Sequence, residues 1–231
     1  MVINSFAARR VAVGLAACLL SMGAAHADVV REAGLGYGLY SGSLQLPVQA
    51  SPANYWSGFQ TIQVKDNFSS LLSQSFAALC VDPYQYSTGT FNTYTTYIKT
   101  DLSAFGSKSA DIIALYNEAY AGAQTDNRKA AAMQLALWEV AYDDKNLLTG
   151  NVQTVAGTNA NLKADAQLLL DNLGLYAGPS QYTFNLYTNA TYQDYLVAAP
   201  VPEPETYAML LAGLGLLGFI ARRRKQEEAS A

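Results

Sequence analysis

Apolar residues along the chain follow two different spacings. In the first half they alternate with small or polar residues, which predicts β-strands. These strands cover Leu35 to Val48, Phe59 to Val64, Ser75 to Val81 and Phe91 to Ile98. The middle has the three-to-four-residue spacing of helices, at about 109–122, 126–142 and 159–173, and strand patterns return at Tyr182 to Tyr187 and Tyr192 to Val197. This order predicts an α+β fold: a mostly antiparallel β-sheet or sandwich with a helical insertion of about three helices.

The second predicted helix has one polar side chain on its apolar face. The residues sharing that face are Ala130, Gln134, Leu137, Trp138 and Ala141. A buried amide without a partner costs about 1–3 kcal/mol, so Gln134 is expected to have a hydrogen-bonding or covalent partner. Cys80 is the candidate. It lies near the end of a predicted strand, since Asp82-Pro83 begins a loop.

The N-terminus has the pattern of a signal peptide. Arg9-Arg10 precedes an apolar run from Val11 to about Gly23, and Ala25-His26-Ala27 matches an A-x-A cleavage site. This predicts a signal helix within residues 1–27, which is removed from the mature chain. Cys18 also fits a lipoprotein cleavage box, but the apolar run continues past it, which favours signal peptidase I over lipidation.

The C-terminus predicts a membrane anchor. A linker at 200–206 precedes an apolar run at 207–221, which is slightly shorter than the roughly 17–25 residues that usually cross a bilayer. The tail at 222–231 begins with four basic residues, Arg222, Arg223, Arg224 and Lys225. Such a cluster predicts a cytoplasmic C-terminus after a transmembrane helix. A single domain at 28–199 would then lie outside the inner membrane.

Three features of this tail resemble the PEP-CTERM sorting signal. They are the motif Pro202, Glu203 and Pro204, the glycine-containing segment Gly213-Leu214-Gly215, and the basic end. The resemblance implies recognition by an exosortase, a membrane-embedded sorting transpeptidase, and removal of the tail. It also implies delivery to the surface or exopolysaccharide matrix of a Gram-negative bacterium. The alternative is an ordinary C-terminal membrane anchor.

Composition narrows the chemistry of the exported domain. Residues 28–199 contain eight basic and 14 acidic residues, with no basic stripe, which disfavours nucleic-acid binding. Cleavage of the signal peptide removes His26, the only histidine, and one of the two cysteines. Histidine-dependent catalysis, histidine-containing zinc sites and an intramolecular disulfide are thereby excluded. No cofactor is expected, and the cluster Glu139, Asp143 and Asp144 is interpreted as a solvated helix end rather than a cation site.

The segments around Cys80 and Gln134 resemble the paired motifs of bacterial thioester domains. They are Leu79-Cys80-Val81 and Gln134-Leu135-Ala136-Leu137-Trp138, with Met133 where Thr or Ser is usual. The resemblance implies a bond between the Cys80 thiol and the Gln134 side-chain carbonyl, with loss of ammonia. It further implies covalent capture of a partner amine by a surface protein that is not a turnover enzyme. The residues alone also allow an alternative, in which Cys80 is a small buried hydrophobe and Gln134 a hydrogen-bonded core amide. The protein would then be a non-covalent matrix protein.

Overall fold

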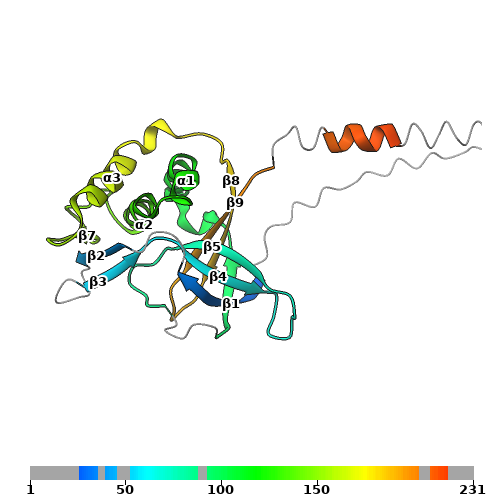
Figure 1. Ribbon diagram of the computed structural model, residues 1–231, viewed down its shortest axis with the longest axis horizontal. Helices are drawn as coiled ribbons and strands as arrows, with labels where there is room; N and C mark the ends of the chain where they lie inside the picture. The colour runs from blue at the N-terminus through cyan, green and yellow to red at the C-terminus, as the bar shows by residue number, and fades with distance from the viewer. Residues whose placement is uncertain (1–25, 36–39, 46–52, 88–92, 203–208, 218–231) are drawn as a thin grey trace, which may run out of the picture.

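The computed structural model describes residues 26–35, 40–45, 53–87, 93–202 and 209–217 (Figure 1). Residues 1–25 of the signal peptide predicted at 1–27 lie outside the described residues, as does the basic cluster Arg222 to Lys225, whereas His26 and Ala27 begin the first strand. Residues 209–217 of the predicted anchor are helical and exposed. Among the described residues, no helix has the length and apolar character needed to cross a membrane.

Six antiparallel strands form a closed barrel in the order β1-β4-β5-β9-β8-β6. They are β1 (His26–Leu35), β4 (Gln60–Lys65), β5 (Gln74–Cys80), β6 (Thr95–Thr100), β8 (Tyr182–Thr188) and β9 (Tyr195–Pro200). The antiparallel α+β prediction is confirmed, but the sheet closes on itself instead of forming a sandwich. It closes because β1, which the sequence analysis did not predict, pairs with β4 on one side and with β6 on the other.

A second, smaller sheet lies beside the barrel (Figure 1). Its strands are β2 (Tyr40–Gln45), β3 (Ala53–Ser57) and β7 (Gln153–Thr154), in the order β3-β2-β7. The alternation from Leu35 to Val48 thus contributes the end of β1 and the central strand of this sheet. Because β7 lies more than 100 residues after β2 in the chain, the small sheet joins segments far apart in sequence.

Three helices lie between β6 and β8, as predicted. They are α1 (Ser109–Ala123), α2 (Asn127–Tyr142) and α3 (Ala160–Asp171), with short 3-10 turns η1 (Leu102–Lys108) and η2 (Leu173–Leu175). Helix α2 begins after Asp126, whose side chain accepts a hydrogen bond from the Lys129 N–H at 2.9 Å. It packs against α1 and α3 and contacts β2 and β3. As a result, every residue from Ala130 to Ala141 is buried.

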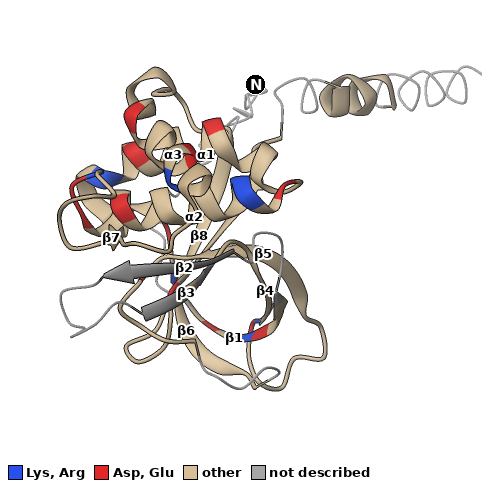
Figure 2. Ribbon diagram, turned by 60° about the vertical axis from the view of Figure 1, so that its left-hand side comes forward, with Lys and Arg blue, Asp and Glu red and all other residues tan. Residues whose placement is uncertain are grey.

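Charged residues gather on the helices and their loops, and few lie on the barrel (Figure 2). The barrel wall is instead rich in threonine and tyrosine, for example in β6 and β8. Such residues suit a pleated surface that is half exposed. The two halves of the domain therefore present chemically different surfaces.

Asn159 is the N-cap of α3, and its side-chain oxygen accepts hydrogen bonds from the N–H groups of Asn161 and Leu162. Asn159→Ala is expected to lower the free energy of unfolding by about 1 kcal/mol, because both N–H groups lose their partner. Asn159→Asp keeps the acceptor and should stay close to the wild type. Urea unfolding of the three proteins measures the difference, and equal midpoints for all three would contradict the capping role.

Candidate functional site

The structure brings Cys80 and Gln134 together. Cys80 is the last residue of β5, and Gln134 lies in the first half of α2. The Cys80 N–H donates to Oε1 of Gln134 at 3.0 Å, and Nε2 of Gln134 donates to the Cys80 carbonyl at 2.6 Å. The pairing of β4 with β5 ends at Ala78, so β4 offers no hydrogen-bond partner to the backbone of Cys80. The side-chain amide of Gln134 takes its place and bonds both the N–H and the carbonyl of Cys80.

Both residues of this pair are enclosed. Cys80 is 2 % exposed and Gln134 is fully buried. Burial raises the pKa of the Cys80 thiol far above its usual range, and the nearby Glu32 carboxylate raises it further. The thiol is therefore protonated at neutral pH. An unpaired cysteine in an exported domain could form a disulfide with a second chain. The burial of Cys80 prevents such a disulfide between two folded chains.

The barrel interior next to Cys80 is polar. Cys80 pairs with Tyr195 across β5 and β9, so the two side chains point to the same face of the sheet. The Tyr195 hydroxyl donates to Oε1 of Glu32, a residue of β1 that is 5 % exposed. Tyr97 packs against Tyr195 with ring centroids 5.8 Å apart. Glu32 and Tyr195 were not predicted from the sequence. The spacing of Asp28, Val30 and Glu32, two residues apart, was the available signal for a row of side chains on one face of β1.

Other predicted residues take more ordinary roles. Oδ1 of Asp82 accepts the Tyr84 N–H at 2.8 Å, so Asp82 closes a turn directly after the Cys80 strand. Trp138 is a core residue, and its ring and that of Tyr55 pack edge-to-face with centroids 6.1 Å apart. Glu139, however, is fully buried, and the interpretation of a solvated helix end is wrong for this residue.

The predicted processing residues lie at the margins of the described chain. Ala27 is exposed and pairs with Ile98 in the ladder between β1 and β6. Pro202 is exposed and follows β9 by two residues. Ala25, Glu203 and Pro204 lie outside the described residues. Cleavage after Ala27 would leave β1 beginning at Asp28, and this boundary stays a prediction.

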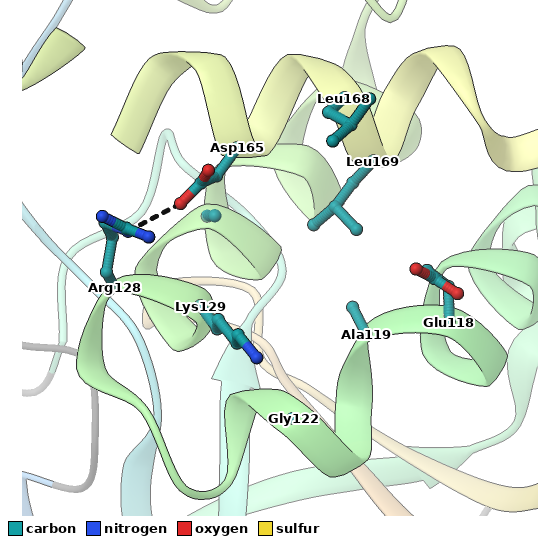
Figure 3. A pocket seen from close by; sticks show the side chains of 9 residues that line it. Glu118, Ala119, Gly122, Arg128, Lys129, Asp165, Leu168 and Leu169 are labelled. Atoms are coloured by element: carbon teal, nitrogen blue, oxygen red, sulfur yellow. Dashed lines mark ion pairs between the residues drawn. The ribbon is translucent and has the colours of Figure 1, made fainter. Parts of the chain in front are cut away.

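A pocket of about 230 Å³ lies between the three helices (Figure 3). Its lining residues are Glu118, Ala119, Gly122, Arg128, Lys129, Ala132, Asp165, Leu168 and Leu169. Arg128 and Asp165 form an ion pair across its rim, with Nε and Oδ2 2.7 Å apart. Neither Cys80 nor Gln134 lines this pocket, so it is separate from their contact.

Residues 200–225 match the family model of the PEP-CTERM protein-sorting motif. The match confirms the predicted resemblance to the PEP-CTERM sorting signal and spans the Pro-Glu-Pro motif and the basic cluster. It indicates an exported protein that is sorted to the cell surface, and it implies processing by an exosortase. A comparison of the chain with curated proteins gives no match.

Solved structures that are similar to this chain include two domains of bacterial proteins. One is the N-terminal domain of the Streptococcus pyogenes pilus tip adhesin Cpa, with 13 % identity, a TM-score of 0.43, and coverage of 74 % of this chain and 99 % of that one. The other is the N-terminal thioester domain of a surface protein from Clostridium perfringens, with 14 % identity, a TM-score of 0.42, and coverage of 70 % and 100 %.

Proposed function

We propose that the domain at 28–199 carries an internal thioester between Cys80 and Gln134, and that it attaches covalently to an amine on a surface or matrix partner. The paired contact of the Gln134 amide with the Cys80 backbone is the observation that carries this proposal. It holds a carboxamide beside the single cysteine of the exported chain. Together with the sorting tail, it describes an adhesive or structural component of the envelope or extracellular matrix.

The chemistry needs only these two side chains. Sγ of Cys80 attacks Cδ of Gln134, the bond from Cδ to Nε2 breaks, and ammonia leaves with the thiol proton. The Cys80 N–H, 3.0 Å from Oε1, is placed to stabilise the negative charge that develops on this oxygen. An amine then attacks Cδ, the bond from Cδ to Sγ breaks, and the partner is amide-linked to Gln134 while Cys80 regains its proton. Each molecule reacts once, so this is attachment rather than turnover.

A second function is supported by the same contact. The amide of Gln134 has a donor and an acceptor partner in the Cys80 backbone, which is how a purely structural buried amide is satisfied. Burial also keeps the thiol protonated and therefore weakly nucleophilic. In this alternative the protein is a non-covalent component of an exopolysaccharide or biofilm matrix, and Cys80 and Gln134 are core residues.

Intact mass distinguishes the two functions. The exported chain, purified without reductant at mildly acidic pH, is expected to be lighter than its sequence by one ammonia. Methylamine should then add as a methylamide on Gln134 and expose one thiol, because the amine replaces Cys80 on the acyl carbon.

The matched control for this experiment is Cys80→Ala, which should have the mass of its sequence before and after methylamine. A wild-type chain of unmodified mass, with a free Cys80 in denaturant from the start, would contradict the thioester and leave the non-covalent role.

A further inference from the structure

A buried acid lies near the C-terminal end of α2, away from the Cys80–Gln134 contact. Glu139 is fully buried, and neither of its carboxylate oxygens has a hydrogen-bond partner within the described part of the chain. The N–H groups of Lys145 and Asn146 face this carboxylate, but neither reaches hydrogen-bonding geometry. An unpartnered carboxylate in such a place requires neutralisation.

Two further carboxylates converge on Glu139. One oxygen each from Glu139, Asp143 and Asp144 lies within 4.8 Å of the others. This spacing is compatible with a single ion bound to all three. The group comprises the end of α2 and the first residues of the following loop at 143–152, so a short stretch of chain provides the whole cluster.

The loop holds both aspartates in place with neutral donors. Oδ2 of Asp143 accepts the N–H groups of Asn151 and Val152. Asp144 accepts the Asn146 N–H at 3.0 Å and the Thr149 hydroxyl at 2.9 Å. These contacts orient the carboxylates and leave their negative charge uncompensated.

Gly150 is needed for this arrangement of the loop. It has a φ of 80°, and a Cβ at this position would clash with the carboxylate of Asp143. Only glycine fits so close to the carboxylate, because any larger residue would push Asp143 aside.

The nearby lysines are occupied elsewhere. Nζ of Lys145 pairs with Oδ2 of Asp111 at 2.6 Å, and Nζ of Lys108 donates to the Ala141 carbonyl at 2.8 Å. Within the described residues, none of the three clustered carboxylates forms an ion pair with a basic side chain. The last carbonyl groups of α2 add a partial negative charge at this end, which the Lys108 contact with Ala141 compensates only in part. The surroundings therefore favour a bound cation.

We propose that Glu139, Asp143 and Asp144 form a Ca²⁺ site at the C-terminal end of α2. The donors are all oxygen, which suits a hard divalent cation, and Ca²⁺ accepts irregular geometry completed by backbone carbonyls and water. Mg²⁺ demands a near-ideal octahedron and is held less often by a cage of protein ligands alone. Bound Ca²⁺ ties the loop at 143–152 to the helix that carries Gln134, and it does so whether or not the thioester forms.

Calorimetry on the exported full chain tests this site. The chain is stripped with EDTA, transferred to metal-free buffer at neutral pH, and titrated with CaCl₂ while the melting temperature is followed in parallel. One Ca²⁺ per chain is expected to bind with a Kd of roughly 0.1–1 mM, the range of extracellular calcium modules, and to raise the melting temperature. Glu139→Gln, of nearly equal size, is expected to raise the Kd at least tenfold.

Two more variants sharpen the result. Asp144→Asn alters an exposed member of the cluster and should also raise the Kd at least tenfold, so it decides the matter if Glu139→Gln does not fold. Glu118→Gln removes an exposed charge from α1 and should leave the Kd unchanged. Absence of any Ca²⁺-dependent heat or melting shift in the wild type would overturn the site, as would wild-type affinity in Asp144→Asn. Equal affinity for Mg²⁺ would overturn the assignment to Ca²⁺.

Discussion

Gln134→Ala is expected to leave the domain less stable than Cys80→Ala does, by about 1–3 kcal/mol, although both variants lose covalent amine capture. The reason is the paired contact at the end of β5. Gln134→Ala removes the partners of the Cys80 N–H and carbonyl inside the core, whereas Cys80→Ala keeps both backbone hydrogen bonds. The two variants are compared with each other, because both lack a thioester and so any crosslink effect cancels.

Urea unfolding of the two variants measures this difference, and methylamine incorporation by mass measures capture. Gln134→Met is the matched control: it fills much of the same volume without the amide, so it separates the lost hydrogen bonds from the cavity. Its stability should lie closer to that of Gln134→Ala than to that of Cys80→Ala. Equal unfolding midpoints for Gln134→Ala and Cys80→Ala would show that the amide contact contributes no stability, and capture by either variant would rule out the thioester.

Tyr195→Phe is expected to lower the free energy of unfolding by about 1.5–3 kcal/mol. The Tyr195 hydroxyl donates to Glu32 inside the barrel, and Glu32 is 5 % exposed. Removing the hydroxyl leaves a buried carboxylate without this donor, and a hydrogen bond to an acidic group contributes more than one between neutral groups. Urea unfolding at neutral pH gives the change directly.

Tyr97→Phe is the matched control for that experiment. Tyr97 packs on Tyr195, but its hydroxyl donates to a neutral acceptor, the Gln193 carbonyl, at 3.2 Å. We expect this variant to lose only about 1 kcal/mol. Adding Glu32→Gln to Tyr195→Phe should restore part of the loss, since an uncharged amide replaces the carboxylate. A double variant that is no more stable than Tyr195→Phe alone would contradict the role of the Glu32 charge.

The helix that carries Gln134 could be predicted closely from local signals. Its apolar spacing ends at Tyr142, and Asp126 marks its start, so the predicted range of 126–142 differs from α2 by one residue. The partner of Gln134 could also be predicted, because a polar residue on an apolar face requires one and Cys80 stood out. The form of the contact could not, since the pairing of a side-chain amide with the strand backbone depends on where β4 stops.

The closure of the barrel could not be predicted from the sequence, for a different reason. Asp28 and Glu32 share one face of β1 with Val30 and are buried, so acidic residues occupy a face that is apolar in the usual half-buried strand. The stretch also overlaps the end of the predicted signal peptide. Closure depends on the pairing of β1 with β6, a strand that begins at Thr95, far from β1 in the sequence. No local sequence pattern specifies a contact between segments so far apart.

Glu139 was misjudged because α2 was assumed to have one solvated face. A helix with neighbours on one side would expose Glu139 to water. Helix α2 instead has α1 and α3 on one side and β2 and β3 on another, so a charged position became part of the interior. Burial of a helix on all sides is a property of the assembled layers, and periodicity alone does not reveal it.

The end of β9 limits how far the sorting motif can reach from the barrel. β9 ends at Pro200 and pairs with both β5 and β8, and the Val201 N–H still donates to the Gln181 carbonyl at 2.9 Å. Pro202 is therefore only two residues beyond the wall, a span of about 7 Å even when fully extended. An enzyme that binds this motif would therefore lie next to the folded barrel, because almost no free chain separates the two. A protein that binds this motif is therefore held close to the barrel wall, and its orientation relative to the barrel is restricted.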